Sequence, residues 1–266
     1  MKVFYFTGTG NSLYIAKKIK ESFRKTEIVS IPQVIDDEKK EYEDEVIGIV
    51  FPTYSCNIPK IVKDFLKNVN FKAKYKFAIA TYGNNINGDG DVVGSFNNLT
   101  KSLDMTFDYI NSILMVDNYL DIFEVDKELA KVPSKEIDKN LNKIILDIKD
   151  NKKYIKKISI VRKGFTIILK PSVKMMEGGL ASKDFVINNK CDSCGTCAKV
   201  CPTKNILVED GKPLFCKKCI KCYACIHACP KNAIHLKSEK SSKRYRNPNV
   251  SLKEIIDANN QYKRKK

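Results

Sequence analysis

The stretch that decides the fold reads FYFTGTGNSLYIAKKI and covers residues 4–19. A short apolar run ends in a loop of small residues, Thr7-Gly8-Thr9-Gly10-Asn11-Ser12. Apolar side chains then recur at Leu13, Ala16 and Ile19, which is the spacing of one helix face. Such a loop places backbone N–H groups at the N-terminus of a helix, where they favour a bound anion. Because the loop contains no lysine or arginine, we expect neutral donors, including its hydroxyls, to hold that anion.

Two common nucleotide-binding loops do not fit this stretch. A P-loop requires GxxxxGK[ST], and no lysine follows Gly10. The dinucleotide motif GxGxxG fails because residue 13 is leucine. A simple helix cap would explain Asn11 or Ser12 alone, but not six small residues in a row. We therefore predict an anion loop of another type.

The first 153 residues alternate between strand-like and helix-like segments. We expect strands at 2–6, 27–31, 46–51, 76–81 and 107–116. We expect helices at 12–23, 59–66, 91–103 and 134–153. This alternation predicts a parallel sheet covered by helices on both faces, with ligands bound beyond the carboxyl ends of its strands.

The loop after the first strand resembles the phosphate loop of flavodoxins, which usually reads T/S-x-T-G-N-T. This sequence departs from it only at Ser12, which keeps the hydroxyl. The resemblance implies a flavodoxin-like, doubly wound sheet of order 2-1-3-4-5 and an FMN whose phosphate lies in residues 7–12. It also implies two loops around the flavin ring, Pro52-Thr53-Tyr54-Ser55 and Thr81-Tyr82-Gly83-Asn84. Tyr54 is the first candidate to pack on that ring, and Tyr82 is the second.

Most of the ten cysteines belong to an internal duplication. Residues 191–202 read CDSCGTCAKVCP and residues 219–230 read CIKCYACIHACP, so that each is C-x2-C-x2-C-x3-C-P. The two copies are offset by 28 residues, and Ile206 and Ile234 keep the same register. Dense cysteines in a cytoplasmic chain indicate metal rather than disulfides.

The spacing predicts two [4Fe–4S] clusters. Three closely spaced thiolates reach one cluster, and the fourth cysteine, followed by proline, ligates the other cluster in two-cluster ferredoxins. The first cluster is therefore expected on Cys191, Cys194, Cys197 and Cys229. The second is expected on Cys219, Cys222, Cys225 and Cys201. The alternative is two zinc ions, whose sites usually present separated CxxC pairs. The runs resemble bacterial ferredoxins with two [4Fe–4S] clusters, which implies a small α+β domain.

Three further residues of metal-binding type are not expected to be ligands. Cys216 forms C-x2-C with Cys219, but its counterpart in the duplication is Asn188. Cys56 is isolated in the chain, and a lone cysteine is more often a packing residue. His227 lies inside the second motif, where we expect an exposed helix position.

The positive charge is confined to the C-terminal part. Residues 1–153 carry no net charge, so the whole excess of +17 lies in residues 154–266. Two clusters with their thiolates would offset part of it, and nearby positive side chains favour a reduced cluster. The remaining charge predicts docking to redox partner proteins with acidic surfaces. No apolar run reaches the roughly 18 residues of a membrane span, and we find no secretory signal, so we expect a cytoplasmic protein.

These features divide the chain into four segments. Residues 1–153 are expected to form a flavodoxin-like FMN-binding domain, and residues 154–182 a linker. Residues 183–238 are expected to form the two-cluster ferredoxin domain, and residues 239–266 a basic tail whose VSLKEII segment forms a short helix packed on the body.

The whole arrangement resembles the flavodoxin–ferredoxin fusion proteins of anaerobes. The resemblance extends to Asn118-Tyr119 and to Arg246-Asn247-Pro248. It implies an electron-transfer protein that relays electrons between FMN and two [4Fe–4S] clusters and couples one-electron to two-electron redox partners.

Two other functions stay open. One is an FMN-dependent oxidoreductase that acts on a small molecule with the clusters as electron input. The sequence shows no acid–base pair, nucleophile or substrate motif for it, which favours the electron carrier. The other is a nucleic-acid-binding iron–sulfur protein. A solvated basic tail explains the same charge, so we do not expect nucleic acid as a partner.

Overall fold

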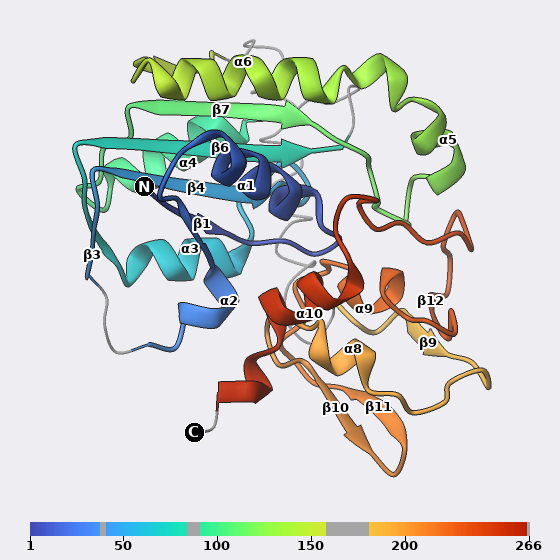
Figure 1. The fold of residues 1–266 in the computed structure, drawn as a ribbon. Coiled ribbons are helices and arrows are strands. Elements are labelled where there is room, and N and C mark those ends of the chain that lie inside the picture. The colour runs from blue at the N-terminus through green and yellow to red at the C-terminus, as the bar shows by residue number, and fades with distance from the viewer. Residues whose placement is uncertain (38–40, 84–90, 158–180, 265–266) are drawn as a thin grey trace.

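The computed structural model describes residues 1–37, 41–83, 91–157 and 181–264 (Figure 1). Its N-terminal unit is built on a six-stranded sheet of order β2-β1-β4-β6-β7-β8, in which all neighbours are parallel. The strands are β1 (Lys2–Tyr5), β2 (Glu27–Ser30), β4 (Val46–Pro52), β6 (Tyr75–Tyr82), β7 (Tyr109–Leu114) and β8 (Tyr154–Ile155). Apart from β8, these strands follow the order 2-1-3-4-5, which confirms the flavodoxin-like doubly wound topology.

Helices cover both faces of this sheet (Figure 1). One face carries α1 (Asn11–Ser22) and α6 (Ile137–Lys149), and the other carries α3 (Lys60–Lys67) and α4 (Val92–Lys101). A strand between two helical layers must be apolar throughout, and β4 accordingly reads VIGIVFP. In the described part of the chain, no helix is both long enough and apolar enough to cross a membrane.

Short elements complete the N-terminal unit. They are α2 (Ile31–Val34), α5 (Val125–Ala130), a 3-10 turn (Pro133–Lys135) and a parallel strand pair, β3 (Glu41–Glu43) with β5 (Asn70–Lys72).

Two boundaries differ from the sequence prediction. The helix expected at 134–153 begins at Ile137, because Pro133 opens a 3-10 turn and Glu136 has a left-handed φ of 43°. The expected linker 154–182 begins as strand β8, which pairs with β7 through Tyr154 and Ile155. Most of that linker, residues 158–180, lies outside the described residues.

The C-terminal unit repeats its backbone as well as its cysteines. It holds α8 (Thr196–Lys199), α9 (Ala224–His227), the hairpin β10 (Ile206–Glu209) with β11 (Lys212–Phe215), and the antiparallel pair β9 (Phe185–Ile187) with β12 (Ile234–Leu236). Left-handed residues recur at the offset of 28 in three pairs: Ser193 and Lys221, Gly195 and Tyr223, Lys204 and Asn232. The sequence duplication is therefore also a structural one, and the unit is the small α+β domain that was predicted.

The basic tail folds back onto the N-terminal unit. Its helix α10 (Leu252–Asn259) begins in a capping box, in which Ser251 and Glu254 each accept the other's backbone N–H. It packs against α2 and buries Ile255 and Ala258. The predicted amphipathic helix is thus present, and it ties the C-terminal end of the described chain to the N-terminal unit.

One of the two apolar clusters of the described residues runs through both units. Tyr14 and Val116 of the N-terminal unit lie in one contiguous cluster with Val200, Ile226 and Ile255 from the C-terminal part. Burial of apolar surface along this cluster stabilises the arrangement of the two units as well as each unit.

Gly48 leads to a prediction about this sheet. It pairs with Phe77 on β6, and a Cβ added at Gly48 would lie 2.1 Å from the ring Cζ. We expect Gly48→Ala to lower the free energy of unfolding by about 2 kcal/mol, since overpacking a core typically costs ~1–3 kcal/mol. Denaturant unfolding measures the change. Adding Phe77→Leu should recover part of the loss, and an undiminished stability of Gly48→Ala would contradict the packing.

Candidate functional site

The four cysteines expected to hold the first cluster line one small cavity. We call it the first cysteine cavity, and it is lined by Cys191, Cys194, Cys197 and Cys229. Three of them come from the first sequence run, and Cys229 comes from the second. Cys194 is exposed, so one side of this cavity is open to solvent.

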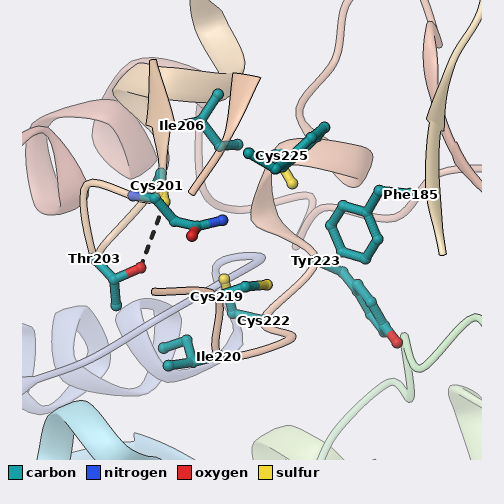
Figure 2. Close-up of a pocket in the computed structure, with 11 residues that line it drawn as sticks. Phe185, Cys201, Thr203, Ile206, Cys219, Ile220, Cys222, Tyr223 and Cys225 are labelled. Atoms are coloured by element: carbon teal, nitrogen blue, oxygen red, sulfur yellow. Dashed lines mark hydrogen bonds between the residues drawn. The ribbon is translucent and has the colours of Figure 1, made fainter. Parts of the chain in front are cut away.

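The other four cysteines line another small cavity, the second cysteine cavity, which is shown in Figure 2. Its cysteines are Cys201, Cys219, Cys222 and Cys225. Apolar and aromatic side chains close it, including Ile206, Phe185 and Tyr223. Cys201, Cys219 and Cys225 are buried, so the second cavity is shielded from water where the first is not. Cys216 lines neither cavity.

Backbone N–H groups point at sulfur atoms in both cavities. The amide nitrogen of Asn205 lies 3.2 Å from Cys201 Sγ, and that of Ala233 lies 3.2 Å from Cys229 Sγ. These two bonds occupy the same position in the two repeats. Lys221 N–H donates to Cys219 Sγ at 3.4 Å. Hydrogen bonds of this kind stabilise a thiolate and tune the reduction potential of an iron–sulfur cluster.

The two cavities can be compared with the ligand geometry of zinc and of a cubane cluster. Within the described residues, no group of three or more His, Cys, Asp or Glu side chains converges closely enough to hold a single metal ion. Zinc requires its ligands to converge on one ion with Zn–S distances of about 2.3 Å. A cubane spreads its four thiolates over four separate irons. Burial raises the pKa of the Cys197 and Cys219 thiols to about 11, so a metal must displace their protons when it binds.

The predicted anion loop lies at the carboxyl end of β1 and is buried throughout. Its side chains Thr7, Thr9 and Ser12 are at most 4% exposed. The backbone N–H groups of the first helical turn, from Asn11 to Leu13, donate to no other described residue. Unpaired N–H groups at the start of a helix are the donors that a phosphate uses. The loop therefore fits an anion of this kind.

The structure brings the other two predicted loops to the same edge of the sheet. Ser12 Oγ lies 2.9 Å from Thr81 Oγ1, and Thr53 donates to the Thr81 carbonyl from both its N–H and its hydroxyl. Pro52 ends β4 and leads into the turn Tyr54-Ser55-Cys56-Asn57, where Ser55 and Cys56 have left-handed φ values of 47° and 61°. Backbone strain of this kind is common at ligand-binding loops.

The two tyrosines differ in their surroundings. The hydroxyl of Tyr54 lies 3.1 Å from the position that a Cβ on Gly8 would take, so Tyr54 adjoins the anion loop. Tyr82 lies at the end of β6 with Lys156 Nζ 5.5 Å from its ring centroid. Gly83 follows it, and Asn84 lies outside the described residues.

A buried lysine, Lys135, lies beneath the loop that contains Gly83, and the sequence did not predict it. Lys135 Nζ donates to the carbonyls of Gly83 and Met115 at 2.8 and 2.7 Å, and it pairs with Glu128 at 3.1 Å. The side chains of Lys135 and Glu128 are 4% and 2% exposed. No local pattern distinguishes Lys135 from the many surface lysines, because its role depends on contacts with distant residues.

His227 is on helix α9 as predicted, but it is buried rather than exposed. Its Nδ1 accepts the Tyr245 N–H at 3.1 Å, and its Nε2 lies 3.0 Å from the Asn118 carbonyl oxygen. Both ring nitrogens are therefore used for packing against neighbouring segments. The Asn118 side chain in turn donates to Thr9 Oγ1 of the anion loop.

The second cysteine cavity touches the anion loop directly. The carbonyl oxygen of Cys222 lies 2.7 Å from the position of a Cβ on Gly8. Beside it, the Tyr223 ring stacks on Tyr119 with centroids 5.7 Å apart, and the Tyr223 hydroxyl donates to Asp121. These contacts put the two predicted cofactor sites next to each other, which the sequence did not reveal.

Comparison with protein families identifies the C-terminal region. Residues 147–248 match a family described as a 4Fe-4S dicluster domain. The matched region contains both cysteine runs and extends into α6 on one side and the tail on the other. No curated protein matches the chain significantly.

Solved structures similar to this chain cover its N-terminal half. They include a flavoprotein from Bacteroides uniformis (TM-score 0.34, 14% identity, 49% of this chain and 96% of that chain). Others are a Trp repressor binding protein from Bacillus subtilis (0.32, 13%, 53% and 97%) and a flavoprotein with FMN from Lactobacillus acidophilus (0.30, 16%, 51% and 97%). Because these TM-scores are low, the fold assignment rests on the strand order of the sheet.

The crossed cysteine sets predict how iron is lost. We expect Cys201→Ser and Cys219→Ser, alone or combined, to remove the same half of the iron, about four atoms per chain. Combining Cys201→Ser with Cys191→Ser should instead remove nearly all of it. Iron analysis and absorption spectra of the anaerobically purified variants measure this. A larger loss in the first double variant than in its two single variants would show that the sets are not crossed.

The buried lysine gives a second prediction. Lys135→Met should lower the free energy of unfolding by about 3 kcal/mol, because it leaves the Glu128 carboxylate buried beside two unpaired carbonyls. Lys131→Met is the matched control, since Lys131 pairs with the same carboxylate from an exposed position and should cost below about 1 kcal/mol. Denaturant unfolding measures both. Equal effects would mean that burial of Lys135 is not what stabilises the loop.

Proposed function

We propose that this chain, in which a flavodoxin-like unit precedes a 4Fe-4S dicluster domain, relays electrons between a bound FMN and two [4Fe–4S] clusters. The relay would couple redox partners that exchange one electron with partners that exchange two. The observation that carries this proposal is the contact between the second cysteine cavity and the anion loop, at Cys222 and Gly8. Cofactors held at these two places would be neighbours within one chain.

The residues that would hold FMN are those of the three loops at the carboxyl edge of the sheet. Backbone N–H groups of the anion loop would take the phosphate, together with the hydroxyls of Thr7 and Thr9. Tyr54 and Tyr82 would flank the ring. The site has neutral donors in place of a charged side chain, so its hold on the phosphate depends on how those donors are oriented.

The two cysteine cavities would each hold one cluster. FMN, when bound, exchanges one or two electrons, whereas an iron–sulfur cluster passes one at a time. The protein contributes N–H groups to the sulfurs, an apolar wall around the second cavity and an exposed side at the first. Exposure of Cys194 favours the first cavity as the place where a partner protein exchanges electrons.

A redox protein with an acidic docking surface is the partner that fits this exposed side. The lysines of the C-terminal unit outnumber its acidic residues, and electrostatic complementarity speeds the encounter of oppositely charged surfaces.

The first test is the cofactor content of the protein. Anaerobic purification should give about eight irons and one FMN per chain, with no zinc. Absorption spectra and quantitation of iron, sulfide, zinc and released flavin measure this. Zinc in place of iron, or full iron without flavin uptake, would overturn one half of the proposal. Sustained turnover of quinones, nitro compounds or a nicotinamide by the purified protein would favour the FMN-dependent oxidoreductase instead.

The anion loop is tested by Thr9→Glu. A carboxylate in a loop that binds phosphate through neutral donors should abolish FMN retention by charge repulsion. Thr9→Ser keeps the hydroxyl and is the control, for which we expect retained flavin. Iron content, which should not change in either variant, reports whether the chain folds. Full flavin retention in Thr9→Glu would contradict the assignment of this loop.

A further inference from the structure

The polypeptide from Tyr245 to Asn260 crosses the anion loop, and we call it the C-terminal strap (the red segment in Figure 1). Its backbone N–H at Asn247 donates to the Thr9 carbonyl at 2.9 Å. The Tyr245 hydroxyl and the Asn247 side-chain amide donate to Asn11 Oδ1 at 2.7 and 3.2 Å. The Asn259 amide donates to the Thr7 carbonyl at 3.0 Å.

These four bonds share one direction, because the strap always donates and the loop always accepts. A loop that binds an anion has two kinds of polar group, donors that attract the anion and carbonyl or amide oxygens that repel it. The strap donates hydrogen bonds to the backbone carbonyls of Thr7 and Thr9 and to the side-chain oxygen of Asn11. The N–H groups of the first helical turn stay unpaired.

Two hydroxyl oxygens of the loop also accept hydrogen bonds from the protein. Thr7 Oγ1 accepts the N–H of Gly10 at 3.0 Å, and Thr9 Oγ1 accepts the Asn118 side-chain amide. A hydroxyl has one hydrogen to donate and can accept elsewhere. Each of these hydroxyls therefore keeps its hydrogen for a ligand.

We propose that the C-terminal strap is a positioning element of the anion site, which turns a loop of mixed polarity into a surface of donors. Its positioning residues are Tyr245, Asn247 and Asn259. This inference rests on the proposed function, since the anion is taken to be the phosphate of FMN. It explains how a loop without lysine or arginine holds a phosphate.

The three positioning residues of the strap are buried, which favours their hydrogen bonds to the loop over bonds to water. Tyr245, Asn247 and Asn259 are at most 4% exposed, so their donors cannot bond to water instead if the contacts with the loop are lost. Leaving such a buried donor unpaired would destabilise the protein. Ion pairing of Lys17 with Glu254 at 2.6 Å and donation by Ser30 to the Ala258 carbonyl at 2.6 Å hold α10 in place.

The strap is also tied to the second cysteine cavity. Its first residue, Tyr245, donates to His227 on α9, the helix that carries Cys225. The anion site is thus completed by a segment that the C-terminal unit anchors at one end and α10 anchors at the other.

The test compares FMN with riboflavin, which has the same ring but no phosphate. Affinities are measured by fluorescence titration of the flavin-free protein with its iron retained. We expect Asn259→Asp to weaken FMN binding about tenfold or more while riboflavin binding stays nearly unchanged, because a carboxylate replaces a donor beside the loop. Tyr245→Phe should weaken FMN binding severalfold with the same selectivity. Lys253→Ala, on the exposed side of α10, is the control that should change neither affinity.

Each outcome decides the matter. Unchanged FMN affinity in both variants, or equal losses for FMN and riboflavin, would overturn the inference, because a strap with a merely structural role affects both ligands. If Asn259→Asp loses its iron, which would show that it fails to fold, the flavin affinities of Tyr245→Phe test the proposal. This variant removes only the hydroxyl that bonds Asn11 and keeps the aromatic ring of residue 245. Wild-type protein that binds neither flavin would overturn the proposed function itself, a result that the control and the iron content distinguish from a failure of the strap.

Discussion

The close approach of two segments at Gly8 is the constraint on which the rest of the structure depends. The Cys222 carbonyl and the Tyr54 hydroxyl occupy the space where a side chain on Gly8 would be, so the second cysteine cavity and the anion loop meet without an intervening layer. Any larger residue at this position would push the two units apart. The shared apolar cluster and the bonds of Asn118 to Thr9 and of His227 to Asn118 join the same two units.

The two halves of the duplication have diverged where they meet the N-terminal unit. At the left-handed position before each short helix, the first copy has Gly195 and the second has Tyr223. A left-handed conformation is strained for a residue with a side chain. Tyr223 offsets that strain through its ring contact with Tyr119 and its hydroxyl bond to Asp121. A side chain at Gly195 would meet no atom within 4 Å to offset such strain, and glycine adopts this conformation without strain.

Local hydrophobic periodicity predicted most strands and helices of the N-terminal unit, since strands buried on both faces and helices with one apolar face leave clear patterns in the sequence. The cysteine spacing also predicted the two groups of four that line the two cavities. That each group holds a cluster stays a prediction. Local patterns missed strand β8, the burial of His227 and the ion pair of Lys135, because each of these depends on a partner that lies far away in the chain. The predicted exposure of His227 was wrong for this reason: Tyr245 and Asn118 cover it from two distant segments.

The sequence by itself determined the chemistry of the parts: an anion loop with neutral donors, two runs of four cysteines and a short helix in the tail. These are encoded by residue type and spacing within a few turns of chain. Only the tertiary structure decided that the second cysteine cavity adjoins the anion loop, and that the strap pairs the oxygens of that loop. The contact of Tyr245 with Asn11 joins residues 234 positions apart, and no local pattern encodes such a pair. The apolar cluster that both units share also includes Tyr245, Val250 and Ile255, and it holds the tail across the carboxyl edge of the sheet.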